Sequence, residues 1–244
     1  MRNLRKSRLG TGLLLVAAAV VAAASLAGIS LALPQPVASY FFGPTMVRAE
    51  VILMAKDGVR DLRLDRGRIR ALTPTAVTLK ERDGLIVTVP IAPSARVHVN
   101  GRAMGGIFAL RRGMEAVIVQ DGESGVAESV YAVSKRDASS FAVPRPFMNH
   151  LFGASMMRTE AVLKTATGFV DYRIDRGRVR SVGPSSVTLR ERDGLVVTVP
   201  VAAGARIQVN GRLSGLAGLK AGMEAMTIRD GNRPADTIQV PPRR

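Results

Sequence analysis

The sequence predicts an all-β protein made of two tandem small β-barrel domains, preceded by one apolar N-terminal helix. Three observations predict this fold. A long apolar run lies near the N-terminus, a unit of about 100 residues occurs twice, and each copy alternates apolar and polar residues between turn signals. We expect residues 1–32 to be a signal peptide or membrane anchor, residues 33–142 the first barrel and residues 143–244 the second.

The N-terminal segment predicts export of everything that follows it. The run from Leu9 to Leu33 is uncharged, almost wholly apolar and long enough to span a bilayer as a helix. Four basic residues precede it and hold the N-terminus in the cytoplasm: Arg2, Arg5, Lys6 and Arg8. The alternative is a signal peptide cleaved after Ala27 or Ala32. In both cases we expect the barrels to be extracytoplasmic, either membrane-anchored or secreted.

An internal duplication sets the domain organisation. The unit that starts at Leu33 is repeated from Val143, and the copies align without a gap as far as Gly101 and Gly211. Of these 69 aligned positions, 35 are identical. The unit is too long for a solenoid repeat and present too few times for a propeller, so it is a tandem domain.

The first part of each copy shows paired strand signals. Residues 49–64 form a leading hairpin, and residues 76–91 alternate on both sides of Asp83-Gly84, which predicts a second hairpin. Between these hairpins the apolar residues change parity at residues 65–67, where a glycine permits a bulge or sharp bend. In each copy we expect six to eight strands, including the leading hairpin, that curl into a small barrel.

The second part of each copy adds a turn, a short helical stretch and two strands. Asn100-Gly101 closes a strand, residues 107–113 predict one helical turn ended by a glycine, and residues 114–133 carry two further strands. The turn and bend residues of the two copies are Gly67, Asp83, Gly84, Asn100, Gly101 and Gly113, with Gly177, Asp193, Gly194, Asn210, Gly211 and Gly222 as their equivalents.

The order of these motifs resembles a known family. Gly-x-Ile, a Thr-Leu strand, Asp-Gly, a Val-Thr-Val strand, Asn-Gly and a Leu-Lys-x-Gly-Met turn follow one another. This order is similar to that of the OB-like small-barrel family called domain of unknown function fifty-six sixty-six, found in exported bacterial proteins. The resemblance covers about Gly67–Val133 and Gly177–Val240. It implies an OB-like barrel in each copy and structural roles for the turn residues, and it supplies no catalytic residue.

A cluster of arginines is the candidate anion-binding site, because guanidinium groups bind phosphates and carboxylates in a bidentate manner. Arg68 and Arg70 share a strand face by their spacing of two. The alternative is a solvated strand face on which the arginines pair with neighbouring acids, of which Asp61, Asp65, Glu81 and Asp83 are also duplicated. The complete candidate set is Arg63, Arg66, Arg68, Arg70, Arg173, Arg176, Arg178 and Arg180.

Composition narrows the function classes. The chain has a net charge of +16, no Cys, two His and 4% aromatic residues. We therefore expect no catalytic residue, no metal site and no cofactor. Nucleic acid is a poor partner, because OB-type single-strand binders stack bases on aromatic rings. The expected function is a non-catalytic binding or structural module of the cell envelope, with an anionic lipid or cell-wall polymer as its partner. The alternatives are an envelope hydrolase with a carboxylate site, or a nucleic-acid binder if the chain is not exported.

Two smaller features stay open at this point. The aromatic segments 37–46 and 147–156 either cover their own barrels as lids or present an apolar interaction patch. The first segment is also placed to sit at a lipid interface. His98 has Gln208 as its equivalent, so it belongs to no duplicated site and we expect an exposed strand residue.

Overall fold

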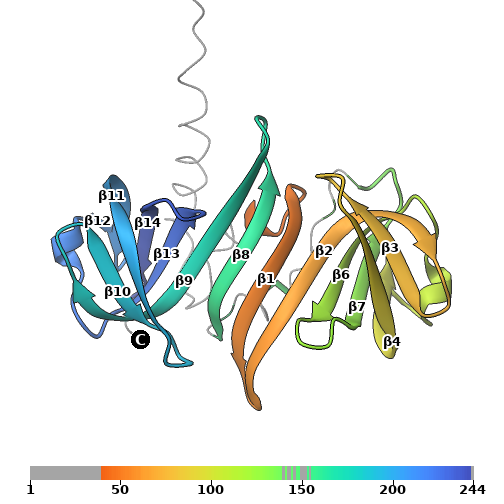
Figure 1. Cartoon of the computed structure of the whole chain (residues 1–244), viewed down its shortest axis with the longest axis horizontal. Coiled ribbons are helices and arrows are strands. Elements are labelled where there is room, and N and C mark those ends of the chain that lie inside the picture. Colours follow the sequence, from red (N-terminus) through yellow and green to blue (C-terminus); the bar gives the residue numbers. More distant parts are fainter. Residues whose placement is uncertain are drawn as a thin grey trace, which may run out of the picture.

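The computed structural model describes residues 40–138, 141, 144, 147–148, 153 and 155–242. These residues fold as an all-β protein whose fourteen strands join one mixed sheet (Figure 1), which confirms the predicted class. The predicted N-terminal helix and the boundary at residue 142 lie outside the described residues. Within the described part of the chain, no helix is long and apolar enough to cross a membrane.

Each half contributes seven strands in the same order. The first half contains β1 (Met46–Ala55), β2 (Gly58–Leu72), β3 (Ala76–Glu81), β4 (Ile86–Val99), β5 (Arg102–Met104), the 3-10 helix η1 (Ile107–Ala109), β6 (Glu115–Asp121) and β7 (Ala127–Val133). The second half contains β8 (Met156–Lys164), β9 (Phe169–Val182), β10 (Ser186–Arg190), β11 (Val196–Val209), β12 (Arg212–Ser214), η2 (Leu216–Gly218), β13 (Glu224–Asp230) and β14 (Ala235–Val240).

Five strands of each half close into a ring. In the first half β2 pairs with β3, β3 with β4, β4 with β7, β7 with β6, and β6 again with β2. Only the β4–β7 pair of this ring is parallel. The strands β9, β10, β11, β14 and β13 close in the same way, with β11–β14 parallel. This barrel-like arrangement is compatible with the OB-like barrel that the sequence predicts.

The first strand of each half, β1 or β8, lies outside the ring of that half. The expectation that the whole leading hairpin curls into its own barrel is therefore wrong. β1 pairs with β2 on one side and with β8 on the other, so it connects the two halves. Glu50 lies opposite Glu160, its own equivalent in the second copy. An antiparallel pair in this register has a local two-fold axis perpendicular to the sheet. The β1–β2 and β8–β9 hairpins accordingly point in opposite directions (Figure 1).

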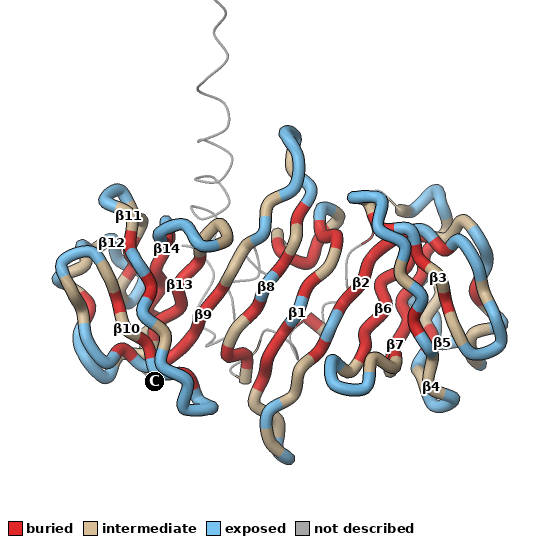
Figure 2. Tube along the Cα trace, viewed as in Figure 1, coloured by how far each residue is buried: buried red, intermediate tan, exposed pale blue. Residues whose placement is uncertain are grey.

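The buried apolar residues form three cores, and Figure 2 marks the buried positions along the strands. One core fills each ring, and the third, the central core, lies against β1, β2, β8 and β9 and takes residues from both halves. Leu62 and Leu64 enter the central core, whereas Ile69 enters the core of the first ring, as the predicted change of parity requires. Because each fully buried aliphatic side chain contributes about 1.5–3 kcal/mol, the shared core holds the halves together.

The aromatic segments belong to this shared core. The ring of Phe41 lies 5.2 Å from that of Tyr172, and the ring of Tyr40 lies 6.1 Å from it. In the other direction, Phe147 lies 5.4 Å from Tyr131 of the first half. The described aromatic residues therefore pack across the molecule, and neither predicted alternative, an own-barrel lid or an exposed patch, describes them.

Gly67 has a different role from the one expected. A Cβ atom at this position would lie 2.5 Å from the carbonyl oxygen of Lys80, so the close approach of β2 and β3 requires a glycine. The shift of register between these strands falls instead at Arg70. The Asn100-Gly101 pair has φ angles of 50° and 76°, the positive values that a two-residue type I′ hairpin turn needs.

Candidate functional site

The eight candidate arginines divide by strand face. Alternation along β2 puts Arg66, Arg68 and Arg70 on the face that carries Leu62 and Leu64, and puts Arg63 on the other. The same division applies on β9, where Arg176, Arg178 and Arg180 share a face and Arg173 lies opposite. The structure therefore does not bring the eight side chains together into one strip.

Arg66 is fully buried and bonded within the protein. Its Nε donates to Glu115 at 3.0 Å, and its Nη1 atom donates to the carbonyl oxygens of Gly43 and Phe141 at 2.8 and 3.0 Å. The guanidinium also lies 5.2 Å from the centre of the Phe141 ring. Burial is the main reason that the pKa of Arg66 is lowered. These bonds leave no site for an external anion.

Arg176 has the equivalent position in the second half. Its Nε donates to Glu224 at 2.8 Å and its Nη1 donates to the carbonyl of Gly153 at 3.1 Å, and burial lowers its pKa as well. The prediction of an anion-binding role is therefore wrong for Arg66 and Arg176, because a guanidinium closed off from solvent cannot meet a ligand. Both arginines have a structural role. Each links its strand, β2 or β9, to the segment that precedes β1 or β8.

Arg63 and Arg173 follow the alternative interpretation, in which arginines pair with neighbouring acids. The Nε atom of Arg63 lies 3.2 Å from Asp65, and that of Arg173 lies 3.2 Å from Glu160. The Arg173–Glu160 pair is exposed to solvent, and exposed pairs contribute about 0.2–1 kcal/mol. They neutralise the charge on this face of the sheet rather than offer it to a ligand.

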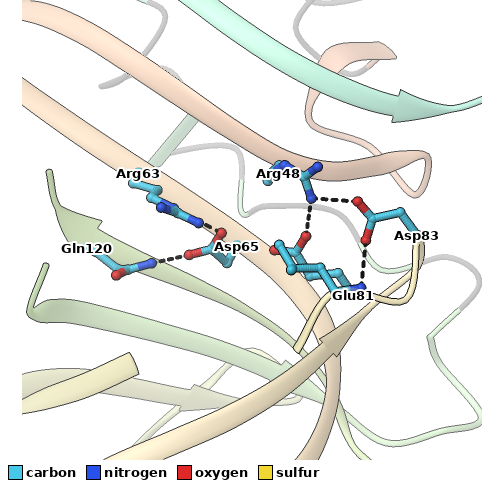
Figure 3. A network of polar contacts seen from close by, with 7 residues as sticks. Arg48, Arg63, Asp65, Glu81, Asp83 and Gln120 are labelled. Carbon is cyan, nitrogen blue, oxygen red and sulfur yellow. Dashed lines mark hydrogen bonds and ion pairs between the residues drawn. The ribbon is translucent and has the colours of Figure 1, made fainter. Parts of the chain in front are cut away.

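A buried carboxylate network lies beside them (Figure 3). Asp65 is fully buried and accepts from Gln120, while the carboxylate of Glu81 is bonded to Arg48. Arg48 also donates to Asp83 at 2.7 Å. The second copy repeats the arrangement, with Arg158 bonded to Glu191 and to Asp193, the latter at 2.7 Å.

Burial raises the pKa of two of these carboxyl groups. Desolvation, reinforced by the neighbouring Asp65, raises the pKa of Glu81 to about 7. Desolvation, with smaller effects of Asp193 and Asp175, raises the pKa of Glu191 to about 7. A carboxyl group with such a pKa is suited to general acid catalysis. However, the side chains of Glu81 and Glu191 have no exposed surface and are covered by Arg48 and Arg158, so a substrate cannot reach them.

A cavity of about 450 Å³ lies in another part of the first half. The carboxylates of the network do not line it, and the carboxylate that does, Glu128, accepts a hydrogen bond from Arg60 at 2.7 Å. His98 stacks on Tyr131 beside this region at 5.1 Å, so it is half-buried rather than the exposed residue that we expected. The lining residues include Arg60, Leu62, Arg96, Val119, Tyr131 and Phe147.

The arginines that remain available lie on the outer face of the rings. Arg68 is the register partner of Lys80, and Arg178 is the register partner of Arg190. Like charges directly opposite each other on adjacent strands destabilise a sheet. We call the exposed cations of this face the basic strips: Arg68, Arg70 and Lys80 in the first half, and Arg178, Arg180 and Arg190 in the second.

No acidic residue in the part of the chain that the structure describes neutralises the basic strips. Among the residues that the structure describes, none of these six cations forms an ion pair, whereas the two buried arginines, Arg66 and Arg176, both do. Glu115, which lies opposite Arg68 on β6, is bound to Arg66 at 3.0 Å and approached by Arg82 at 3.5 Å. Each strip is therefore a solvent-facing cluster of uncompensated positive charge.

Sequence reasoning missed several members of this arrangement. Arg48 and Glu115 were not in the candidate set, although both have charged equivalents in the second copy, Arg158 and Glu224. Lys80 was also missed, and its equivalent Arg190 conserves the charge between the copies. A list of all charged positions shared by both copies would have found these residues. Across the described residues, no group of His, Asp or Glu is placed to hold a metal ion.

Comparison with known proteins adds no assignment. No protein-family model matches the chain, and a search of the curated proteins finds no match. The geometry of the chain itself is therefore the basis for its function.

Proposed function

We propose that the protein is an exported, non-catalytic envelope protein in which two tandem OB-like barrels, spanning residues 33–142 and 143–244, bind an anionic component of the envelope through the basic strips. The duplication of the sequence and the matching order of strand pairs in both halves support the tandem arrangement. The apolar segment Leu9–Leu33 supports export, either as an anchor or as a cleaved signal. The motif order supports kinship with domain of unknown function fifty-six sixty-six.

One observation carries the binding proposal. Both copies place two cations opposite each other on adjacent strands, Arg68 with Lys80 and Arg178 with Arg190, without a described counter-ion. Such pairs cost stability. Their presence at the same place in both copies is explained if an anion neutralises them. The outer face of the second and third ring strands, β3 and β4, is also where OB barrels commonly bind polymers, an analogy of fold.

The chemistry of this face favours phosphate or carboxylate groups over bases. The outer side chains of β3 and β4 beside the strip include Thr78 and Thr88, whose hydroxyl groups lie 2.9 Å apart. None of the residues of β3 or β4 is aromatic apart from His98, which is stacked on Tyr131. Base stacking therefore has no platform there.

Salt-dependent retention on a polyanion tests this proposal. The full-length protein is applied to immobilised inorganic polyphosphate and eluted with salt, because surface electrostatic binding weakens with ionic strength. We expect the variant R68Q/K80Q/R178Q/R190Q to elute at clearly lower salt than the native protein. The matched control R102Q/R112Q/R136Q/R212Q removes the same charge from exposed positions outside the strips and should elute near the native position. Equal losses in both variants, or no retention of the native protein, overturn the proposal.

Cell fractionation tests the predicted compartment separately. The native chain should be found outside the cytoplasm, with an intact N-terminus in the membrane fraction if residues 9–33 anchor it. A mass that begins after Ala27 or Ala32 would identify a cleaved signal. An intact, soluble protein in the cytoplasm would contradict export. It would favour the alternative that the protein is a nucleic-acid binder.

A further inference from the structure

An exposed apolar pair accompanies each basic strip. At the β3–β4 hairpin, Leu85 is 46% exposed and Ile86 is 62% exposed. At the equivalent β10–β11 hairpin, Leu195 is 46% exposed and Val196 is 43% exposed. Single exposed aliphatic residues are common on soluble proteins. Here two adjacent residues are exposed at the same hairpin of both copies, which singles the position out.

One residue of each apolar pair lies in the same cross-strand row as the cations. Ile86 is the register partner of Lys80, which is itself the partner of Arg68, so one row runs from aliphatic to cation to cation. In the second half Val196 pairs with Arg190, which pairs with Arg178. Register partners on antiparallel strands point to the same side of the sheet. With strands about 4.8 Å apart, each row spans roughly 10 Å.

This combination of groups distinguishes two kinds of anion. A soluble or wall-bound polymer is held by the cations alone and gains nothing from exposed leucine and isoleucine. A bilayer with anionic lipids offers phosphate groups to the cations and, a few ångströms deeper, acyl chains to the aliphatic side chains. The rows therefore match a lipid surface better than a polymer.

The two-fold relation lets both strips meet a flat surface. The axis passes between Glu50 and Glu160, perpendicular to the central sheet. A rotation about an axis does not change the position of an atom along that axis. The two basic strips therefore lie at the same level along the two-fold axis. Two sites on one rigid body bind a surface more tightly than either alone, because the second contact is intramolecular.

The chain enters the fold on the side of the strips. Tyr40 packs against the central core, which contains Leu62 and Leu64. These two residues share a face of β2 with Arg66 and Arg68. Tyr40 follows the end of the apolar segment by seven residues, a reach of roughly 25 Å when extended. A membrane that holds Leu9–Leu33 would therefore lie within reach of this face.

We propose that each basic strip and its neighbouring apolar pair form one interfacial membrane-binding surface, in which Leu85, Ile86, Leu195 and Val196 enter the acyl boundary of a bilayer while the strips bind anionic lipid headgroups. This inference rests on the proposed function and specifies its partner as an anionic lipid surface. It requires contact of the hairpin tips with lipid whether or not the N-terminal segment is retained.

A site-specific fluorescent label tests the contact directly. The chain has no cysteine, so the variant I86C carries one label, and the full-length protein is reconstituted into vesicles of phosphatidylcholine with phosphatidylglycerol. We expect an environment-sensitive dye at position 86 to shift to the blue and to be quenched by lipid-borne quenchers, and to lose both effects in vesicles of phosphatidylcholine alone. The control variant E123C carries the dye in the exposed β6–β7 turn, at the far end of β2 from the strip, where the spectrum should not change.

A second variant separates this inference from the proposed function. L85S/I86S/L195S/V196S should elute from polyphosphate at the native salt concentration, because its cations are intact. The labelled I86C variant that also carries L85S/L195S/V196S should show a smaller lipid-dependent shift than I86C alone. An unshifted label at position 86 together with strip-dependent retention on polyphosphate would overturn the membrane inference and leave the proposed function standing. Loss of strip dependence on polyphosphate would overturn both.

Discussion

Glu50 and Glu160 face each other across the β1–β8 pair, although both are carboxylates and each is the equivalent of the other in the duplicated sequence. Arg63 lies on the outer side of Glu50 and Arg173 on the outer side of Glu160. The row therefore reads cation, anion, anion, cation across four strands. The two outer cations offset the repulsion at the centre, where the halves of the molecule meet.

Neutralising one member of this row should stabilise the protein. Burial, followed by Asp61 and Glu160, raises the pKa of Glu50, which means that the fold disfavours its charged form. We expect E50Q to raise the free energy of unfolding at neutral pH by about 0.5 kcal/mol, the size of a repulsive cross-strand pair. Urea denaturation measures it, with E123Q in the exposed β6–β7 turn as a neutral control. A destabilised E50Q would show that attraction to Arg63 outweighs the repulsion.

Arg48 should contribute more to stability than any cation of the basic strips. It compensates Glu81, whose side chain is fully buried, and Asp83 at the tip of the β3–β4 hairpin. Removal of one partner of a buried pair leaves an uncompensated charge. Because Arg48 is itself partly exposed, we expect R48Q to cost about 1–3 kcal/mol. The control R68Q removes an exposed cation without an ion pair and should change stability by less than about 0.5 kcal/mol. Equal effects of both variants would contradict the role of the network.

Local features of this fold were predictable from the sequence, and long-range ones were not. The Asp83-Gly84 and Asn100-Gly101 turns and the alternating strands between them depend on neighbouring residues, so their positions follow from short patterns. The pairing of β1 with β8 joins residues about 110 positions apart. Alternation in β1 indicates a strand with one buried face, but it does not say which strand covers its edge.

The candidate site shows the same limit. Spacing predicted that Arg68 and Arg70 share a strand face, and both are exposed on the outer face of the first ring. The same spacing could not show that Arg66 is closed off while Arg68 stays free, because the carbonyl groups that bind Arg66 belong to Gly43 and Phe141, far away in the chain. Burial of a cation is decided by tertiary packing, and charge patterns alone do not report it.

The stability of the protein should fall as the pH rises through neutrality. The pKa of Glu81 and of Glu191 is about 7 in the fold, against an ordinary value of 4.5. The native state therefore holds protons that the unfolded chain releases between these values. The resulting stabilisation is fully present below pH 4.5 and is lost as the pH passes 7.

Thermal unfolding followed from about pH 5 to about pH 8 measures this loss. One pKa unit corresponds to about 1.4 kcal/mol, so the shifts at the two sites set an upper limit of about 7 kcal/mol on the change in the free energy of unfolding. The variant E81Q/E191Q keeps the shape of both side chains but cannot titrate, and its stability should vary less with pH than that of the native protein. An identical pH profile in the variant would show that other groups cause the dependence.

Gly67 should tolerate no side chain, although its backbone has an ordinary strand conformation. An added Cβ would lie 2.5 Å from the carbonyl oxygen of Lys80, a backbone atom that can move only if β2 and β3 separate. The pair also carries the first basic strip. We expect G67A to cost about 1–3 kcal/mol, as overpacking of a rigid site does, and to reduce retention on polyphosphate through displacement of Lys80. The control G204A lies in β11 with nothing within 4 Å of an added Cβ and should be neutral or slightly stabilising. Equal stability of the two variants would mean that β2 and β3 do not approach as closely as this barrel requires.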